Sequence, residues 1–149
     1  MPDTIYTGGR FEHFGFGVPW EDLANYSQAV RAGDLLFISG QLSHDMDGNF
    51  LKERDVEAQA DVALANLDLV LRRFGAERMD IAEINVFLID LRSNFAPAMA
   101  ACKRYFGEHR PASNVFGVAA LALPEQLIEI AATVVLSPAT DLTAPAQAS

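Results

Sequence analysis

The chain has 149 residues, half of them hydrophobic, and its 20 acidic and 11 basic residues give a net charge of −9. This length fits one domain, and the acidic charge argues against a nucleic-acid binder, because that affinity depends on Lys and Arg neutralising phosphates. No apolar run approaches the roughly 20 residues of a membrane helix, and the first residues lack the basic and apolar segments of a secretory signal. The single cysteine, Cys102, is typical of a reducing compartment, so we expect a cytoplasmic protein.

The N-terminal quarter predicts a hairpin preceded by irregular structure. Residues 1–10 are polar and favour a loose arm, and residues 19–23 are expected to form a loop or short turn. The phenylalanines of residues 11–16 have no clean period, so an edge strand or loop packed on the core is the simpler interpretation, with an aromatic wall over a ligand as the alternative. Residues 26–32 and 35–40 predict the two strands of an antiparallel hairpin.

A long amphipathic helix is predicted over residues 56–74. Asp55 can cap its N-terminus, and Gly75 can end it. Its apolar residues recur at spacings of three and four, which indicates one buried side. They are Ala60, Ala63, Leu67, Val70, Leu71 and Phe74. Asn66 borders that side, and we expect it to form a hydrogen bond with a neighbouring loop.

A strand and a second helix are predicted next. The strand covers residues 84–91. The helix is capped by Ser93 or Asn94 and ends near Gly107, and Pro97 is tolerated because it falls in the first turn.

Two apolar, β-branched segments predict the last strands. They cover residues 111–118 and 127–135, and the turn at residues 121–126 leads us to expect them side by side or nearly so. Small and polar residues then predict a disordered tail over 138–149, so we expect a single domain over 1–137.

The predicted order is strand, strand, helix, strand, helix, strand, strand, which is typical of an α+β fold with two helices covering one sheet face. The other face also carries apolar residues, and two helices of this size cannot cover it. We therefore expect that face to be buried against other copies of the same chain.

Glu129 is a carboxylate within the apolar strand 127–135. Burying an unpaired charge destabilises a folded protein by roughly several kcal/mol. Its neighbours Ile128 and Ile130 face the opposite side of the sheet. Glu129 therefore either meets water or lines a pocket, and from the residues alone the solvent-facing position is the simpler interpretation.

Several motifs occur in the order and spacing of one known family. They are Tyr26-Ser27-Gln28-Ala29-Val30, Ile38-Ser39-Gly40-Gln41, Val86-Phe87-Leu88-Ile89-Asp90-Leu91, Pro111-Ala112, Val118-Ala119-Ala120-Leu121-Ala122-Leu123-Pro124 and Ile128-Glu129-Ile130. Together they make residues 20–135 resemble the Rid (YjgF) family of small imine and enamine hydrolases. The resemblance implies a chorismate-mutase-like fold with a mixed sheet of about six strands and two helices on one face. It also implies a homotrimer that binds small molecules at its subunit interfaces.

The resemblance assigns candidate site residues position by position. Glu129 matches a catalytic glutamate that holds the attacking water, and Tyr26 matches a pocket tyrosine that helps to orient the ligand. The backbone near Ser39 and Gly40 is expected to contact the ligand, and Val115 can offer its carbonyl to the water. The remaining candidate ligand-binding residues are Phe95, Ser113, Asn114 and Pro124. Hydrolysis of a C=N bond needs a positioned water, a base within about 3 Å of it and a group that polarises the imine.

The chain departs from the family pattern at Ser113, directly after Pro111-Ala112. Family members that hydrolyse 2-imino acids carry arginine there, whose guanidinium binds a carboxylate through two parallel hydrogen bonds and stays charged. Losing a charged hydrogen bond costs about 1.5 to 3 kcal/mol, so we expect hydrolysis of 2-imino acids to be much weakened or absent. Arg110 or Arg10 are candidates to compensate, although an exposed arginine is more often a plain surface charge.

These observations favour a Rid-like hydrolase (deaminase) for an imine- or enamine-type metabolite other than the common 2-imino acids. The alternative is a non-catalytic homotrimer that binds or senses a metabolite. A ribonuclease is the weakest hypothesis because of the charge of −9. The three histidines are dispersed, the cysteine and histidine spacings do not match a zinc site, and no glycine-rich phosphate loop follows a strand, so we expect no metal and no cofactor.

Overall fold

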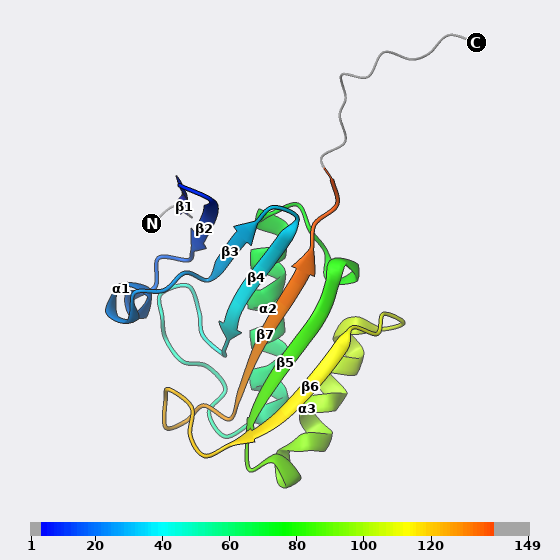
Figure 1. Cartoon of the computed structure of the whole chain (residues 1–149). Helices are drawn as coiled ribbons and strands as arrows, with labels where there is room; N and C mark the ends of the chain where they lie inside the picture. Colours follow the sequence, from blue (N-terminus) through cyan, green and yellow to red (C-terminus); the bar gives the residue numbers. More distant parts are fainter. Residues whose placement is uncertain (1–3, 139–149) are drawn as a thin grey trace, which may run out of the picture.

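The computed structural model describes residues 4–138, which form one mixed sheet with helices on one side (Figure 1). The sheet has seven strands in the order β1-β2-β3-β4-β7-β5-β6, in which only β5 and β6 are parallel. The strands are β1 (Thr4–Gly8), β2 (Phe11–Gly15), β3 (Ala29–Ala32), β4 (Leu35–Gln41), β5 (Ile81–Ile89), β6 (Ala112–Val118) and β7 (Ile128–Val135). The helices are α1 (Pro19–Ala24), α2 (Val56–Arg73), α3 (Leu91–Phe106) and the short 3₁₀ helix η1 (Arg78–Asp80). The predicted α+β fold is confirmed.

Helix α2 matches its prediction closely. The Asp55 carboxylate accepts the Ala58 N–H at 2.9 Å and so caps the first turn. Its predicted apolar side packs on β4 and β7, where Ala60, Leu67 and Val70 are fully buried.

Asn66 ties α2 to the segment that follows β4, as predicted. Its buried side-chain amide donates to the carbonyls of Leu42 and His44, both at 3.1 Å. The loop that follows β4 is therefore fixed to the core by hydrogen bonds as well as by packing.

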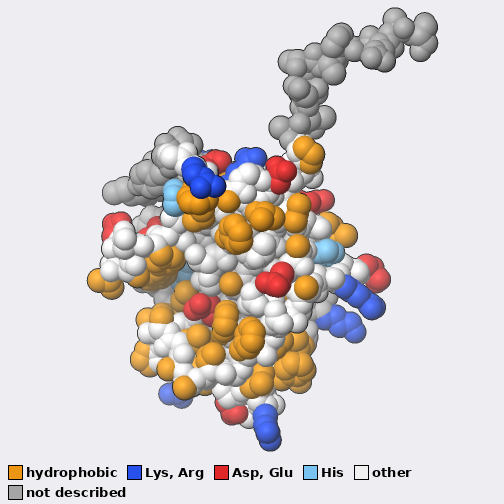
Figure 2. Space-filling view, viewed as in Figure 1, with side chains coloured by type: hydrophobic (Ala, Val, Ile, Leu, Met, Phe, Trp, Pro, Cys, Tyr) orange, Lys and Arg blue, Asp and Glu red, His pale blue; other side chains and the backbone are white. Residues whose placement is uncertain are grey.

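The sheet face opposite the helices, here called the uncovered face, is rich in apolar side chains. Successive strand residues alternate between faces, so Leu36 is fully buried under α2 whereas Leu35 and Phe37 are 40% and 47% exposed. Phe116 of β6 and Val135 of β7 are 46% and 49% exposed. Figure 2 shows hydrophobic side chains spread over this face. Contiguous exposed apolar surface of this kind is typical of an interaction site.

The last two strands, predicted to lie side by side or nearly so, are close but do not pair. Strand β5 lies between β6 and β7, and β6 forms the sheet edge. The reason is the crossover through α3, which returns the chain parallel to β5 on its outer side. The connection from residue 119 to residue 127 is long enough to pass β5 and place β7 beside β4.

The predicted start of the second helix is wrong. Helix α3 begins at Leu91, after Asp90, so Pro97 lies inside the helix rather than in its first turn. Asn94 does not cap the helix, because its side-chain amide donates to the Ile89 carbonyl at 2.7 Å.

The N-terminal segment has more regular structure than predicted. Thr4–Gly8 form β1 instead of a loose arm, since they pair with β2 across a turn. Residues 19–23 belong to α1, where Pro19 suits the first helical position and acidic residues follow in the first turn. Of the predicted tail over 138–149, all but Pro138 lies outside the described residues. Among residues 4–138, no helix is both long and apolar enough to cross a bilayer.

Candidate active site

Glu129 lies near the start of β7 and points to the uncovered face. Its neighbours Ile128 and Ile130 are fully buried on the helix side, while Glu129 itself is half-buried. The alternation predicted from the sequence therefore holds. Because the carboxylate is partly shielded from solvent, hydrogen bonds to it are stronger than they are in bulk water.

A bulge in β4 makes room for this carboxylate. Ser39 and Gly40 together stand opposite one residue of β7, Ala131. A Cβ atom on Gly40 would lie 2.0 Å from Glu129 Oε1, so the carboxylate lies directly against the glycine backbone. Only glycine permits this close approach.

Gln126, in the loop before β7, holds one oxygen of Glu129. Its Nε2 donates to Glu129 Oε2 at 3.0 Å, and the Gln126 residue is 1% exposed. No backbone group of residues 4–138 and no side chain of residues 9–138 donates a hydrogen bond to the other oxygen, Oε1. Glu129 therefore keeps one free acceptor. The sequence analysis missed Gln126, because nothing in the pattern distinguishes it from an exposed loop residue.

The Tyr26 hydroxyl belongs to the same group of side chains. Burial raises the pKa of Tyr26. A hydrogen bond from Gln28 lowers this pKa, and the negative charges of Glu21 and Glu129 raise it. Tyr26 is therefore protonated at neutral pH. Because Gln28 Nε2 donates to the hydroxyl oxygen at 3.2 Å, the hydroxyl hydrogen remains available to a ligand.

Buried glutamines connect Tyr26 to the bulge. Gln28 Nε2 also donates to Glu21 Oε1 at 2.8 Å. Gln41 Nε2 donates to Gln28 Oε1 and to the Ser39 carbonyl, both at 2.9 Å. The bulge is thus held in place by side chains as well as by its neighbouring strands.

The predicted residues of β6 divide between the two faces of the sheet. Ser113 pairs with the buried Ile84, so the side chains of Ser113 and Val115 lie on the helix side. Asn114 lies on the uncovered face, where its Nδ2 donates to Asn85 Oδ1 at 3.0 Å.

Ser113 is far from Glu129 within one protomer. The register aligns Ser113, through Ile84, with Ala132 of β7, three residues beyond Glu129. Three strand residues span about 10 Å, and the two side chains lie on opposite faces. Phe95, 47% exposed, lies in the second turn of α3, which follows the end of β5 that pairs with the start of β7, and Pro124 lies in the loop before β7.

A cavity of about 280 Å³ lies beside Ser113, between α3 and the start of β6. Lys103 and Arg110 also line it, and both are exposed. Cys102 forms part of its wall, and burial raises the pKa of that thiol to about 11, so it stays protonated at neutral pH. Positive charge is therefore present beside Ser113, but on two long, exposed side chains.

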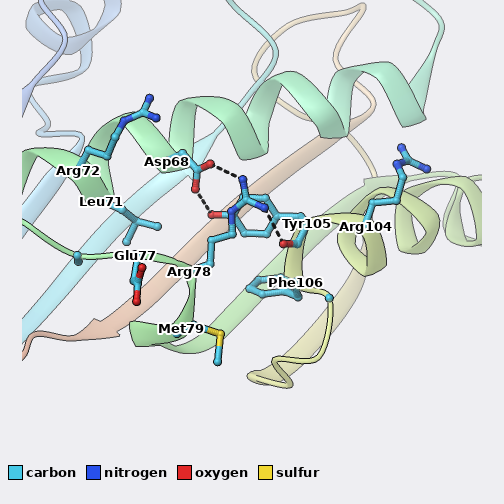
Figure 3. A pocket seen from close by; sticks show the side chains of 11 residues that line it. Asp68, Leu71, Arg72, Glu77, Arg78, Met79, Arg104, Tyr105 and Phe106 are labelled. Atoms are coloured by element: carbon cyan, nitrogen blue, oxygen red, sulfur yellow. Dashed lines mark hydrogen bonds and ion pairs between the residues drawn. The ribbon is translucent and has the colours of Figure 1, made fainter.

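A second cavity, of about 490 Å³, lies between α2, η1 and the end of α3 (Figure 3). Its polar groups bind one another: Arg78 donates to Asp68 at 2.8 Å and to the Tyr105 carbonyl at 2.9 Å, and the Tyr105 hydroxyl donates to Asp68 at 2.7 Å. These bonds join η1 and α3 to α2, so we interpret the cluster as structural. Residues 4–138 contain no group of three or more His, Cys, Asp or Glu side chains that could hold a metal ion.

Comparison with known proteins identifies the family. A family model described as Endoribonuclease L-PSP matches residues 19–136. A solved member of the YjgF/YER057c/UK114 family from Mycobacterium tuberculosis superposes with a TM-score of 0.75 at 26% identity, covering 85% of this chain and 99% of that one. The chain belongs to the Rid (YjgF) family.

Two sequence relatives of this Rid-family chain, one of them named for an activity, also match it over most of their length. A RutC family protein of Pyrococcus horikoshii is 35% identical over 107 residues, which cover 72% of this chain and 83% of the relative. A human protein named 2-iminobutanoate/2-iminopropanoate deaminase is 32% identical over 115 residues, which cover 77% of this chain and 82% of the relative.

Gly40→Ala is expected to displace Glu129 without unfolding the protein. The new Cβ would lie 2.0 Å from Oε1, and the end of a side chain moves more easily than backbone does. Because a misplacement of about 1 Å can cost about 100-fold in rate, we expect any activity that depends on Glu129 to fall by about 10- to 100-fold. Activity assays and a crystal structure of the variant check this. Gly33→Ala, at an exposed turn with φ +63° where alanine is strained, is a control for loss of stability alone and is expected to leave the activity of the folded protein unchanged. Unchanged activity in Gly40→Ala would contradict the prediction.

Proposed function

We propose that this Rid-family protein hydrolyses the C=N bond of a small imine, or of an enamine after protonation to the imine. The observation that carries this proposal is the geometry of Glu129, with Oε2 bound by Gln126 and Oε1 lying against the Gly40 backbone. A fixed carboxylate with a free oxygen is suited to take a proton from an attacking water.

The proposed reaction has two stages. In the first, water adds to the imine carbon, Glu129 Oε1 accepts one proton of the water, and the C=N electron pair moves to the nitrogen, which then receives that proton from Glu129. Tyr26 donates a hydrogen bond to that nitrogen, since burial keeps its hydroxyl protonated. In the second, the carbinolamine hydroxyl gives its proton to Glu129, which passes it to the nitrogen as the C–N bond breaks, so that ammonia or an amine leaves and the carbonyl product remains. One water is consumed for each amine released.

We further propose that the substrate differs from the common 2-imino acids, although the human relative is named for 2-iminobutanoate and 2-iminopropanoate. Ser113 supports this, because one hydroxyl cannot replace the two parallel hydrogen bonds of a guanidinium. Arg110 and Lys103 line the cavity beside Ser113, but that cavity lies on the sheet face opposite Glu129. A neutral or cationic imine therefore suits the carboxylate of Glu129 better.

The proposed working form is a cytoplasmic homotrimer with its ligand at the subunit interfaces. The apolar uncovered face supports self-association, since Phe37 and Phe116 are 47% and 46% exposed in the single chain. The separation of Ser113 from Glu129 supports a shared site. Two residues on opposite faces of one sheet can line the same cleft only if they come from different copies.

A non-catalytic metabolite-binding protein is the second candidate function. One observation favours it. Family members that act on 2-imino acids have an arginine that polarises the substrate, and this chain has Ser113 at that position. The matching family model is described as Endoribonuclease L-PSP. We do not extend that activity to this chain, because a net charge of −9 disfavours binding to a phosphate backbone.

Hydrolysis of imines generated in situ tests the proposal. Anionic imines are made from amino acids with an amino-acid oxidase and neutral ones from amines with an amine oxidase, and the carbonyl product is measured. We expect faster hydrolysis of neutral imines by the natural protein. Ser113→Arg is expected to raise 2-imino acid hydrolysis by about 10- to 150-fold, which corresponds to one charged hydrogen bond.

Two variants serve as controls. Leu69→Arg adds the same charge on α2, where Leu69 is 38% exposed and belongs to neither the candidate site nor the uncovered face, and is expected to leave 2-imino acid hydrolysis unchanged. Arg110→Ser removes the nearest native arginine. If the natural protein prefers 2-imino acids and Arg110→Ser abolishes that preference, Arg110 compensates for Ser113 and the proposed substrate class is wrong. If no imine is hydrolysed by the natural protein or by Ser113→Arg, the binding function is favoured.

A further inference from the structure

Gln126 is a buried amide whose nitrogen and oxygen are both in use. Its Nε2 donates to Glu129 Oε2 at 3.0 Å and to the Ile128 carbonyl at 3.3 Å. Its Oε1 accepts the Leu123 N–H at 3.4 Å. A hydrogen bond to an ionised carboxylate is stronger than one between neutral groups, so this amide fixes the orientation of Glu129 as well as the turn before β7.

Gln59 of α2 holds the loop that carries Gln126. Its Nε2 donates to the Glu125 carbonyl at 3.0 Å, and its Oε1 accepts the Leu127 N–H at 2.8 Å. Gln59 is fully buried. Both residues that flank Gln126 are therefore bonded to the core helix, and the place of the Gln126 side chain is set by α2.

We propose that Gln126 is a positioning residue for Glu129, that Gln59 in turn positions Gln126, and that Glu129 acts through Oε1. This inference rests on the proposed function. Oε2 is bound by Gln126, and Oε1 lies against the backbone of Gly40 without a donor from the backbone of residues 4–138 or the side chains of residues 9–138. Without Gln126, the Glu129 carboxylate would rotate about its side-chain bonds. It would then adopt several orientations, only one of which places Oε1 productively.

A role for Gln126 in loop stability alone makes a different prediction. Removing its amide leaves the Leu123 N–H and the Ile128 carbonyl without this partner, so stability falls in either case. A loss of stability alone lowers kcat only in proportion to the unfolded fraction. The positioning role predicts a lower kcat in the folded protein and a displaced Glu129.

Gln126→Leu tests the inference, because leucine fills a similar volume without a donor. We expect Glu129 to occupy more than one rotamer in its crystal structure. On the imine that the natural protein hydrolyses best, we expect kcat to fall by about 10- to 100-fold while KM changes by less than about threefold. Gln59→Leu is expected to have a smaller effect in the same direction. Gln126→Met serves the same purpose if the leucine variant does not fold.

Tyr105→Phe is the matched control. It removes one hydrogen bond, 2.7 Å to Asp68, in the cluster between α2 and α3 away from the uncovered face. It is expected to lower stability and leave both kcat and the Glu129 rotamer unchanged. A single, unmoved Glu129 rotamer in Gln126→Leu overturns the inference whether or not any imine is hydrolysed. If the natural protein hydrolyses no imine, the proposed function fails, and the crystal structures still decide whether Gln126 positions Glu129.

Discussion

Glu129→Gln is expected to abolish imine hydrolysis and leave the fold intact. The amide matches the carboxylate in shape, and its oxygen can still accept the hydrogen bond from Gln126. It cannot take a proton from water, and loss of a general base typically costs about 10²- to 10⁴-fold in kcat. Steady-state kinetics with the in situ imines measure this, and thermal unfolding followed by circular dichroism checks the fold.

Glu125→Gln is the control for the loss of one negative charge. Glu125 is an exposed residue of the same loop, and only its backbone carbonyl takes part in the contact with Gln59. The kcat of Glu125→Gln is expected to stay close to that of the natural protein. A kcat for Glu129→Gln within about tenfold of the natural value would mean that Glu129 is not the general base.

The helices of this fold are predictable because the interactions that form them are local. The cap at Asp55 and the apolar spacing of α2 act over a few residues, and both are confirmed. The order of strands in the sheet is harder to predict, because it depends on how the long connections between strands cross the sheet. Nothing within residues 111–135 indicates that β5, formed by residues 81–89, separates β6 from β7.

The candidate site is only partly predictable for a similar reason. Strand alternation predicts only the sheet face to which Glu129 points, and the family resemblance alone proposes it as a site residue; both are visible in the order of residues. Gln126, Gln59 and Gln28 were not predicted as site residues, because glutamine is usually exposed and its burial depends on tertiary contacts. Gly40 was expected to contact a ligand, but its role beneath Glu129 depends on the bulge in β4, which only the pairing with β7 shows.

Phe37→Asp is expected to convert the proposed homotrimer into monomers. Phe37 lies in the middle of the uncovered face, between Val30 and Thr133 on the adjacent strands, and is 47% exposed in the single chain. In the assembly, an aspartate at this position would be a buried charge without a partner, which destabilises the subunit interface by roughly several kcal/mol. In the monomer, the same aspartate is exposed to water. Sedimentation or light scattering gives the mass relative to the 16.2 kDa chain.

Leu69→Asp is the matched control, since Leu69 is 38% exposed on α2, on the opposite side of the sheet. It is expected to leave the mass of the assembly unchanged, and a trimeric Phe37→Asp would show that the uncovered face is not the interface.

The monomeric Phe37→Asp variant also separates two explanations of the site. It keeps Glu129, Gln126 and Gly40 in place within each chain, so hydrolysis that persists would mean that one protomer holds the complete site. Loss of hydrolysis with these three residues intact is the outcome expected if each site needs residues from a second copy.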